Sequence, residues 1–222
     1  MSQDIDRKEL TRDPLQDGFF VAVDYVHRHQ REFILGTVAF LVVVAGVAGY
    51  IGYSRYTERA DAEAFLTADR ALQDPGLPQD ARMKKGAEAF QSFVDQHPRS
   101  ELAPAAWMNL ARLAWEQKQW DQAAAAFQHA IDLRKTSSVL RTEALLGLGK
   151  LREQQGKPAE AKALYGQIDD KFQDARELAL GRLALAAGDA KEARAHFQQA
   201  VGAQGDPAVT VQAQEELDAL PR

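Results

Sequence analysis

One uncharged segment limits what this chain can be. Residues 33–53 are 21 consecutive residues without a charged side chain. At about 1.5 Å per residue, a helix of this length measures about 32 Å and covers a bilayer core of about 30 Å. A cleaved signal peptide has an apolar region of about 7–15 residues, and a buried core helix rarely carries so long an uncharged run. We therefore predict a single, uncleaved transmembrane helix at 33–53.

The charges around this segment do not orient it. Arg28 and Arg31 precede it, and Arg55 and Arg59 follow it. Because positively charged residues mark the cytoplasmic side only when they are unequally distributed, the positive-inside rule makes no prediction here.

Small residues gather on one face of the predicted span. Ala45, Gly49 and Gly52 share that face, and Ala48 lies beside them. Side chains of this size let a second transmembrane helix approach closely. We predict a packing face in the membrane, although glycine and alanine are also common in spans that pack against nothing.

The leader, residues 1–32, is a polar and amphipathic segment. Its first twelve residues are highly charged, a composition typical of disorder. Phe19, Phe20, Val23 and Val26 then recur at helical spacing. The pattern fits both a helix lying at the membrane surface and a plain helical extension of the span.

Composition narrows the class of the remaining chain, residues 57–222. It is rich in Ala, Leu, Gln, Glu, Lys and Arg, which favours helix throughout. The net charge of the whole chain is −5 and no basic stripe stands out, so we expect no nucleic-acid partner. The absence of cysteine excludes disulfides, thiol catalysis and thiolate metal sites.

A repeated spacing runs through the soluble part. Its first copy comprises Trp107, Leu110, Ala111, Ala123, Phe127 and Ala130. The second copy, 38 residues later, comprises Leu145, Leu148, Gly149, Ala161 and Tyr165. The third, another 32 residues on, comprises Leu180, Gly181, Ala193, Phe197 and Ala200. Each copy reads as two helical stretches joined by a short turn.

This spacing has a physical cause. Two antiparallel helices pack closely only where small side chains lie at their crossing, and Ala111, Gly149 and Gly181 supply these on the first helix of each pair. The aromatic residue of the second helix fills the wedge between the two. A single hairpin leaves an apolar face uncovered, so stacking neighbouring hairpins creates the core.

The pattern resembles that of tetratricopeptide repeats. The resemblance implies an all-α fold, an α-hairpin solenoid after the membrane helix, with hairpins at about 57–97, 104–133, 139–170 and 174–202 and a capping helix at 207–220. Two departures from the family pattern are Ile168 in place of the later alanine of the second repeat and the missing closing proline.

No catalytic or metal-binding constellation is visible. The five histidines are scattered, and His27 and His29 lie on different faces of any helix that holds both. Serine and threonine show no nucleophile pattern, and Gly147 and Gly149 lie in helical surroundings rather than after a strand. We expect neither an enzyme nor a cofactor, so function must reside in a surface.

The resemblance to tetratricopeptide arrays indicates where that surface lies. In those arrays the first helix of each hairpin lines a concave groove. The corresponding residues here are Met108, Arg112, Trp115, Leu146, Lys150, Glu153, Leu178, Arg182 and Leu185. They form an apolar row beside a cationic row, which suits a peptide with apolar anchors and a carboxylate. Alternatively, Leu146 and Leu178 belong to the core and the cations are ordinary solvated residues.

The order of parts resembles the YfgM-type family of ancillary SecYEG translocon subunits, whose repeat domain is related to that of the cell-division coordinator CpoB. The resemblance covers about residues 17–202. It implies a bacterial inner-membrane protein with a cytoplasmic N-terminus and a periplasmic repeat domain. It also implies protein partners: translocon subunits and a membrane-anchored periplasmic chaperone or prolyl isomerase.

Two other functions remain open from the sequence. The chain could be a general inner-membrane scaffold for envelope assembly or cell division, working through oligomers of its repeats. It could instead expose its repeats to the cytoplasm as a docking platform for soluble chaperones. Either one keeps the same all-α fold and the same absence of chemistry.

Overall fold

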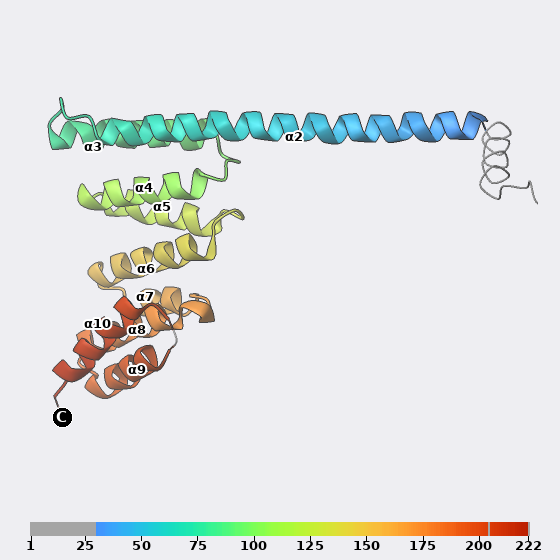
Figure 1. Ribbon diagram of the computed structural model, residues 1–222. Coiled ribbons are helices and arrows are strands. Elements are labelled where there is room, and N and C mark those ends of the chain that lie inside the picture. The colour runs from blue at the N-terminus through green and yellow to red at the C-terminus, as the bar shows by residue number, and fades with distance from the viewer. Residues whose placement is uncertain (1–29, 204, 222) are drawn as a thin grey trace, which may run out of the picture. The chain divides into compact units, whose positions relative to one another are not determined.

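The computed structural model describes residues 30–203 and 205–221, and every regular element in these ranges is a helix. Figure 1 shows these helices with the labels used below. The chain divides into two compact units, Met1–Thr57 and Glu58–Arg222. The all-α fold class predicted from the sequence is confirmed.

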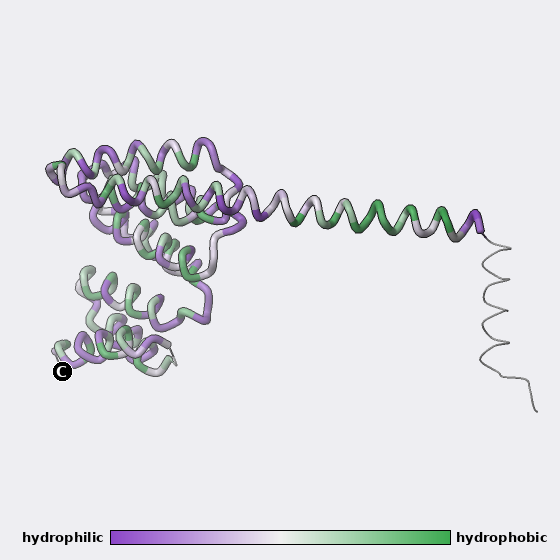
Figure 2. The backbone as a smooth tube through the Cα atoms, turned by 45° about the horizontal axis from the view of Figure 1, so that its top comes forward, coloured by the Kyte–Doolittle hydropathy of each residue, from purple (hydrophilic) through white to green (hydrophobic). Residues whose placement is uncertain are grey.

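The first unit contains the apolar part of helix α2 (Gln30–Leu72). Many of its large side chains, among them Leu35, Phe40 and Val42, are more than half exposed. Figure 2 shows the continuous hydrophobic colouring of this stretch. So large an apolar surface is unfavourable in water and favourable in lipid. The helix is long and apolar enough to cross a membrane, as the sequence predicts.

The structure has one helix where the sequence suggests a span followed by a separate hairpin helix. Residues 54–58 contain no glycine or proline that would end α2. Thr57 supports the helical path, because its hydroxyl donates a hydrogen bond to the carbonyl of Ser54 at 2.8 Å.

Two predictions for the N-terminal part stay predictions. The amphipathic stretch with Phe19, Phe20, Val23 and Val26 lies outside the described residues. The small face of Ala45, Ala48, Gly49 and Gly52 is exposed on α2, and a methyl group at Gly49 or Gly52 would meet no atom within 4 Å.

The second unit begins with a hairpin of residues 58–72 of α2 and helix α3 (Gln79–Gln96). Phe65 of α2 packs edge-on against Phe90 and Phe93 of α3, with ring centroids 5.4 and 5.6 Å apart. At the end of the hairpin away from its turn, the Asp61 carboxylate contacts the ring of His97 at 2.7 Å. The prolines and the glycine of residues 74–78 break the chain between the two helices.

Three further hairpins follow, and each helix packs on the next along the chain. They are α4 (Ala103–Glu116) with α5 (Trp120–Asp132), α6 (Ser138–Gln154) with α7 (Pro158–Tyr165), and α8 (Gln173–Ala186) with α9 (Ala190–Gly202). A 3₁₀ turn, η2 (Asp170–Phe172), precedes α8, and α10 (Pro207–Ala219) ends the stack.

The small residues of the repeat lie where the sequence analysis expects them. A methyl group at Gly181 would come within 2.5 Å of the Phe197 ring, and one at Gly149 would overlap the ring of Tyr165. The aromatic residue of each second helix therefore fills the space that the glycine leaves free, which confirms the wedge argument for these two hairpins.

The turns of these hairpins share one backbone conformation. Lys118, Gly156 and Gly188 have positive φ angles of 58°, 70° and 83°. They are spaced by the same 38 and 32 residues as the rest of the repeat. Glycine takes this conformation freely, whereas Lys118 pays a steric cost for it.

Candidate protein-binding groove

A hollow on the repeat unit lies between α4 and α6, and we call it the α4–α6 groove. Its volume is about 560 Å³. It is lined by Ala105, Met108, Asn109, Arg112, Trp115, Phe127, Leu140, Glu143, Gly147 and Lys150. The residues from α4 and those from α6 each recur at intervals of three or four, so each set forms one stripe along its helix.

Aromatic rings form the floor of this groove. The ring of Phe127 is buried and lies so close to Gly147 that a methyl group there would approach it to 2.6 Å. Trp115 packs edge-on against Phe127 and against Trp120, with centroids 6.4 and 5.7 Å apart. Trp115 itself is half-buried, so one part of its ring is available to a ligand.

The charged side chains of the groove are not neutralised by their neighbours. Arg112 is exposed and reaches only the amide oxygen of Asn109, at 3.4 Å. Within residues 30–203 and 205–221, neither Lys150 nor Glu143 has a hydrogen bond or an ion pair. An amphipathic hollow with uncompensated charges is suited to binding another polypeptide.

A second hollow, the α6–α10 pocket, is smaller and differently built. Its volume is about 330 Å³. It is lined by Leu146, Lys150, Glu153, Tyr165, Ala175, Leu178, Ala179, Arg182, Val209 and Gln212. Residues of the terminal helix α10 thus close one side of it.

Side chains of helix α10 also pair with the arginine of this pocket. Arg182 forms an ion pair with Glu216 at 3.0 Å and a hydrogen bond to Gln212 at 3.4 Å. Glu153 accepts a hydrogen bond from the hydroxyl of Tyr165. Burial, with a further contribution from Glu153, raises the pKa of that tyrosine well above its usual range.

The nine residues expected to form one groove therefore fall into two environments. Met108, Arg112, Trp115 and Lys150 line the α4–α6 groove, and Leu146, Lys150, Glu153, Leu178 and Arg182 line the α6–α10 pocket. Leu178 is only 5% exposed and packs in the core with Phe197, so it offers a ligand little surface. Leu185 lines neither hollow and is 38% exposed.

Six groove residues escaped the sequence analysis: Ala105, Asn109, Phe127, Leu140, Glu143 and Gly147. Glu143 and Leu140 lie seven and ten residues before Lys150, on the same helical face, so the spacing alone could have found them. Phe127 lies on a second helix, and its arrival beneath Gly147 of the next hairpin could not be read from spacing.

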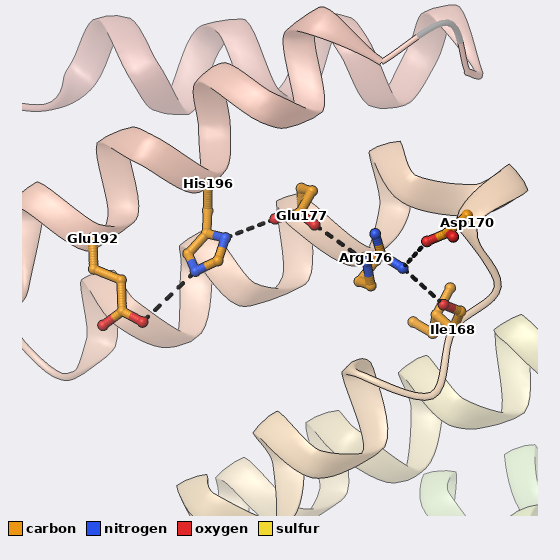
Figure 3. A network of polar contacts seen from close by, with 6 residues as sticks. All are labelled: Ile168, Asp170, Arg176, Glu177, Glu192 and His196. Carbon is orange, nitrogen blue, oxygen red and sulfur yellow. Dashed lines mark hydrogen bonds and ion pairs between the residues drawn. The ribbon is translucent and has the colours of Figure 1, made fainter.

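A polar network joins η2, α8 and α9 away from the groove (Figure 3). Glu177 is almost fully buried and is held by Arg176 at 3.2 Å and by His196 at 2.7 Å. Arg176 also pairs with Asp170 at 2.7 Å, which raises the pKa of the guanidinium further. This network satisfies a buried carboxylate and so serves the packing of the α8–α9 hairpin.

At the far end of the network, Lys162 of α7 pairs with Glu192 of α9 at 2.8 Å. This hydrogen bond lowers the pKa of Glu192. The residues that the structure describes contain no group of three or more histidine or acidic side chains that could hold a metal ion.

Stacked α-hairpins with an amphipathic groove on one side define a repeat protein of the kind that binds other proteins. The chain belongs to the tetratricopeptide repeat-like domain family, whose model matches residues 27–222.

Two known proteins are similar to this chain. The ancillary SecYEG translocon subunit of Aggregatibacter actinomycetemcomitans is 25% identical over 168 residues, which cover 73% of this chain and 78% of that protein. This similarity confirms the resemblance to the YfgM type. A solved structure of a thermophilic tetratricopeptide repeat protein from Thermus thermophilus aligns with a TM-score of 0.45 and 20% identity, over 76% of this chain and 96% of that one.

Proposed function

We propose that this chain is an ancillary subunit of the bacterial protein-export machinery, anchored in the inner membrane by α2 and binding proteins through its repeats. The name of its relative supports a place at the translocon, and its family supports protein binding as the mode of action. The observation that carries the proposal is the α4–α6 groove, where Arg112 and Lys150 flank an aromatic floor without a carboxylate partner.

The groove would bind by a simple physical mechanism. An apolar side chain of the partner covers Trp115 and Phe127, and its burial contributes about 25 cal/mol per Å². A nearby carboxylate of the partner then pairs with Arg112 and Lys150. Because α2 holds the repeat unit at the membrane, the effective concentration of a weakly bound partner rises there. The chain acts by recruitment and performs no chemistry.

In this proposal the N-terminus is cytoplasmic and the repeat unit is periplasmic. The partners are translocon subunits and a membrane-anchored periplasmic chaperone or prolyl isomerase. Gly49 and Gly52, with Ala45 and Ala48, would contact a partner helix or a second copy of this chain within the bilayer. Protease added to spheroplasts should digest the repeat unit. If the repeat unit were protected from the protease, it would lie in the cytoplasm and the proposed orientation would be wrong.

A photo-activated crosslinker in the groove tests the binding role. We would place it at Leu140, which lines the groove, and at Val139, the neighbouring residue, which is 51% exposed but is not part of the groove lining. In intact cells the Leu140 probe should form adducts containing a translocon subunit or a membrane-anchored chaperone, and the Val139 probe should form few. Equal adducts from both positions, or none from either, would contradict the proposal.

A further inference from the structure

The α4–α6 groove has opposite charges at its two ends. Glu143 and Lys150 lie on the same face of α6, seven residues apart, which corresponds to about 10 Å along the helix. Arg112 of α4 is at the repeat position equivalent to Lys150, 38 residues earlier, so both cations lie toward one end. The aromatic floor, with Phe127 beneath Gly147, lies between the two ends.

Several charges of the repeat unit pair within the stack. Arg152 pairs with Glu160 at 3.1 Å, Lys162 with Glu192 at 2.8 Å, and Arg182 with Glu216 at 3.0 Å. Among the described residues, Arg112, Glu143 and Lys150 have no ion-pair partner, which is also true of exposed charges elsewhere such as Glu88 and Lys191. The groove differs from those places because its unpaired charges flank an aromatic floor, with two cations toward one end and a carboxylate toward the other.

We infer that the groove selects an extended polypeptide segment in which a bulky apolar side chain lies two residues from a carboxylate on one side and two residues from a cationic side chain on the other. Charge complementarity carries this inference: the carboxylate faces Arg112 and Lys150, and the cation faces Glu143. Successive side chains of an extended chain point to opposite faces, so the three that face the groove stand at alternate positions. At about 3.3 Å per residue the outer two lie about 13 Å apart, which the long, exposed side chains of Arg112, Lys150 and Glu143 can span. The inference deepens the proposed function and rests on it.

The size of the groove favours an extended segment over a helix. Its volume of about 560 Å³ is that of a site for a drug-sized ligand or a few residues. A helix with its side chains is about 10–12 Å across, so a hollow of this volume would hold only about one turn of it. The apolar anchor must reach the floor, because Phe127 and Trp115 lie there.

Two end-blocked, fluorescent pentapeptides test the selection on the full-length protein in detergent micelles. One has the sequence Lys-Ala-Phe-Ala-Glu, and the other, Glu-Ala-Phe-Ala-Glu, replaces its cation with a second carboxylate. We expect the natural protein to bind the first about tenfold more tightly, which corresponds to about 1.4 kcal/mol. Fluorescence anisotropy measures both affinities.

The matched variant reverses one end of the groove. E143K makes both ends cationic, so it should prefer the second peptide, whereas E88K, an exposed change on α3 outside the groove lining, should keep the original preference. Circular dichroism would verify that both variants are folded, as their exposure leads us to expect. Equal affinities, no binding of either peptide, or an unchanged preference in E143K would overturn the inference. Adducts formed by the Leu140 probe with a translocon subunit would still stand in that case, so the two failures are distinguishable.

Discussion

Arg112 and Arg182 occupy equivalent positions in the first helices of two hairpins, yet their surroundings differ completely. Arg112 lies at an open groove with only Asn109 beside it. Arg182 is bound by Glu216 and Gln212 of the terminal helix α10. A repeat fixes where a side chain projects, and the next element along the stack decides whether that side chain is free to bind.

The hydrophobic core is divided in the same way, into two separate clusters. One core cluster extends from Ala68 of α2 through the hairpins of α4–α7 as far as Leu183. A smaller cluster includes Leu178 and Phe197 and is completed by Ala213 and Leu220 from the end of the chain. Helix α10 thus contributes core residues as well as a partner for Arg182. We call the α6–α10 pocket and the hairpin beneath it the closed end, and the α4–α6 groove the open end. We assign the closed end a structural role.

The largest difference between the two regions should appear when the central aromatic residue of each, Phe197 or Phe127, is replaced by alanine. Phe197 is fully buried in the closed end, so Phe197→Ala should lower the free energy of unfolding by about 3–5 kcal/mol. Phe127 borders the open groove, where water can fill the space left by its ring, so Phe127→Ala should cost less. Urea denaturation of both variants, followed by circular dichroism, measures the difference. A larger loss for Phe127→Ala would contradict the assignment of open and closed ends.

The close helix crossings of the α6–α7 and α8–α9 hairpins should be equally intolerant of an added methyl group. Gly149→Ala and Gly181→Ala each push a methyl group into a buried ring, so each should cost about 1–3 kcal/mol. Gly202→Ala is the control, because a methyl group there meets no atom within 4 Å. The same denaturation experiment decides the matter. If either crossing variant were as stable as the control, the proposed packing of that hairpin would be wrong.

Tyr165 provides a test that depends on pH. Tyr165→Phe removes the hydrogen bond to Glu153 and should cost about 1 kcal/mol at pH 8. Because burial raises the pKa of the folded tyrosine, the stability that it contributes is present below about pH 10, where the unfolded chain holds its phenolic proton, and is lost as pH rises further.

The stability difference between the natural protein and Tyr165→Phe should therefore shrink between pH 8 and pH 11. Lysines that titrate in the same range affect both proteins alike and cancel in the difference. Urea midpoints at the two pH values measure it, and a difference that stays constant would show that Tyr165 is not shielded from water as the structure indicates.

The smallest effect concerns the two equivalent arginines. Arg182→Ala loses a partly exposed ion pair and should lower the free energy of unfolding by about 0.2–1 kcal/mol. Arg112→Ala breaks no ion pair and should leave stability unchanged within error. A thermal melt of each variant compares them; a greater loss for Arg112→Ala would mean that Arg112 has a structural partner after all.

Much of this architecture could be predicted from the sequence because it depends on local patterns. The uncharged run of residues 33–53 and the recurring small and aromatic residues each have a direct physical meaning. What could not be predicted depends on contacts between distant segments. Arg182 meets Glu216 only because α10 folds back against α8, and no local pattern records that approach.

The candidate groove shows the same limit. Arg112 and Lys150 could be selected because they repeat at a fixed interval, but their freedom from carboxylates is a property of the folded stack. Leu178 has the same repeat position as Met108 and is buried instead, because the end of the chain packs against the α8–α9 hairpin.

Above all, we infer that partner proteins bind to the α4–α6 groove and not to the α6–α10 pocket. Crosslinking from the Leu140 probe, measured in cells that carry either R112A together with K150A or R182A alone, tests it directly. We predict that the double variant loses most of its adducts with translocon subunits, while R182A keeps them. Equal adduct yields in the two variants would contradict this account.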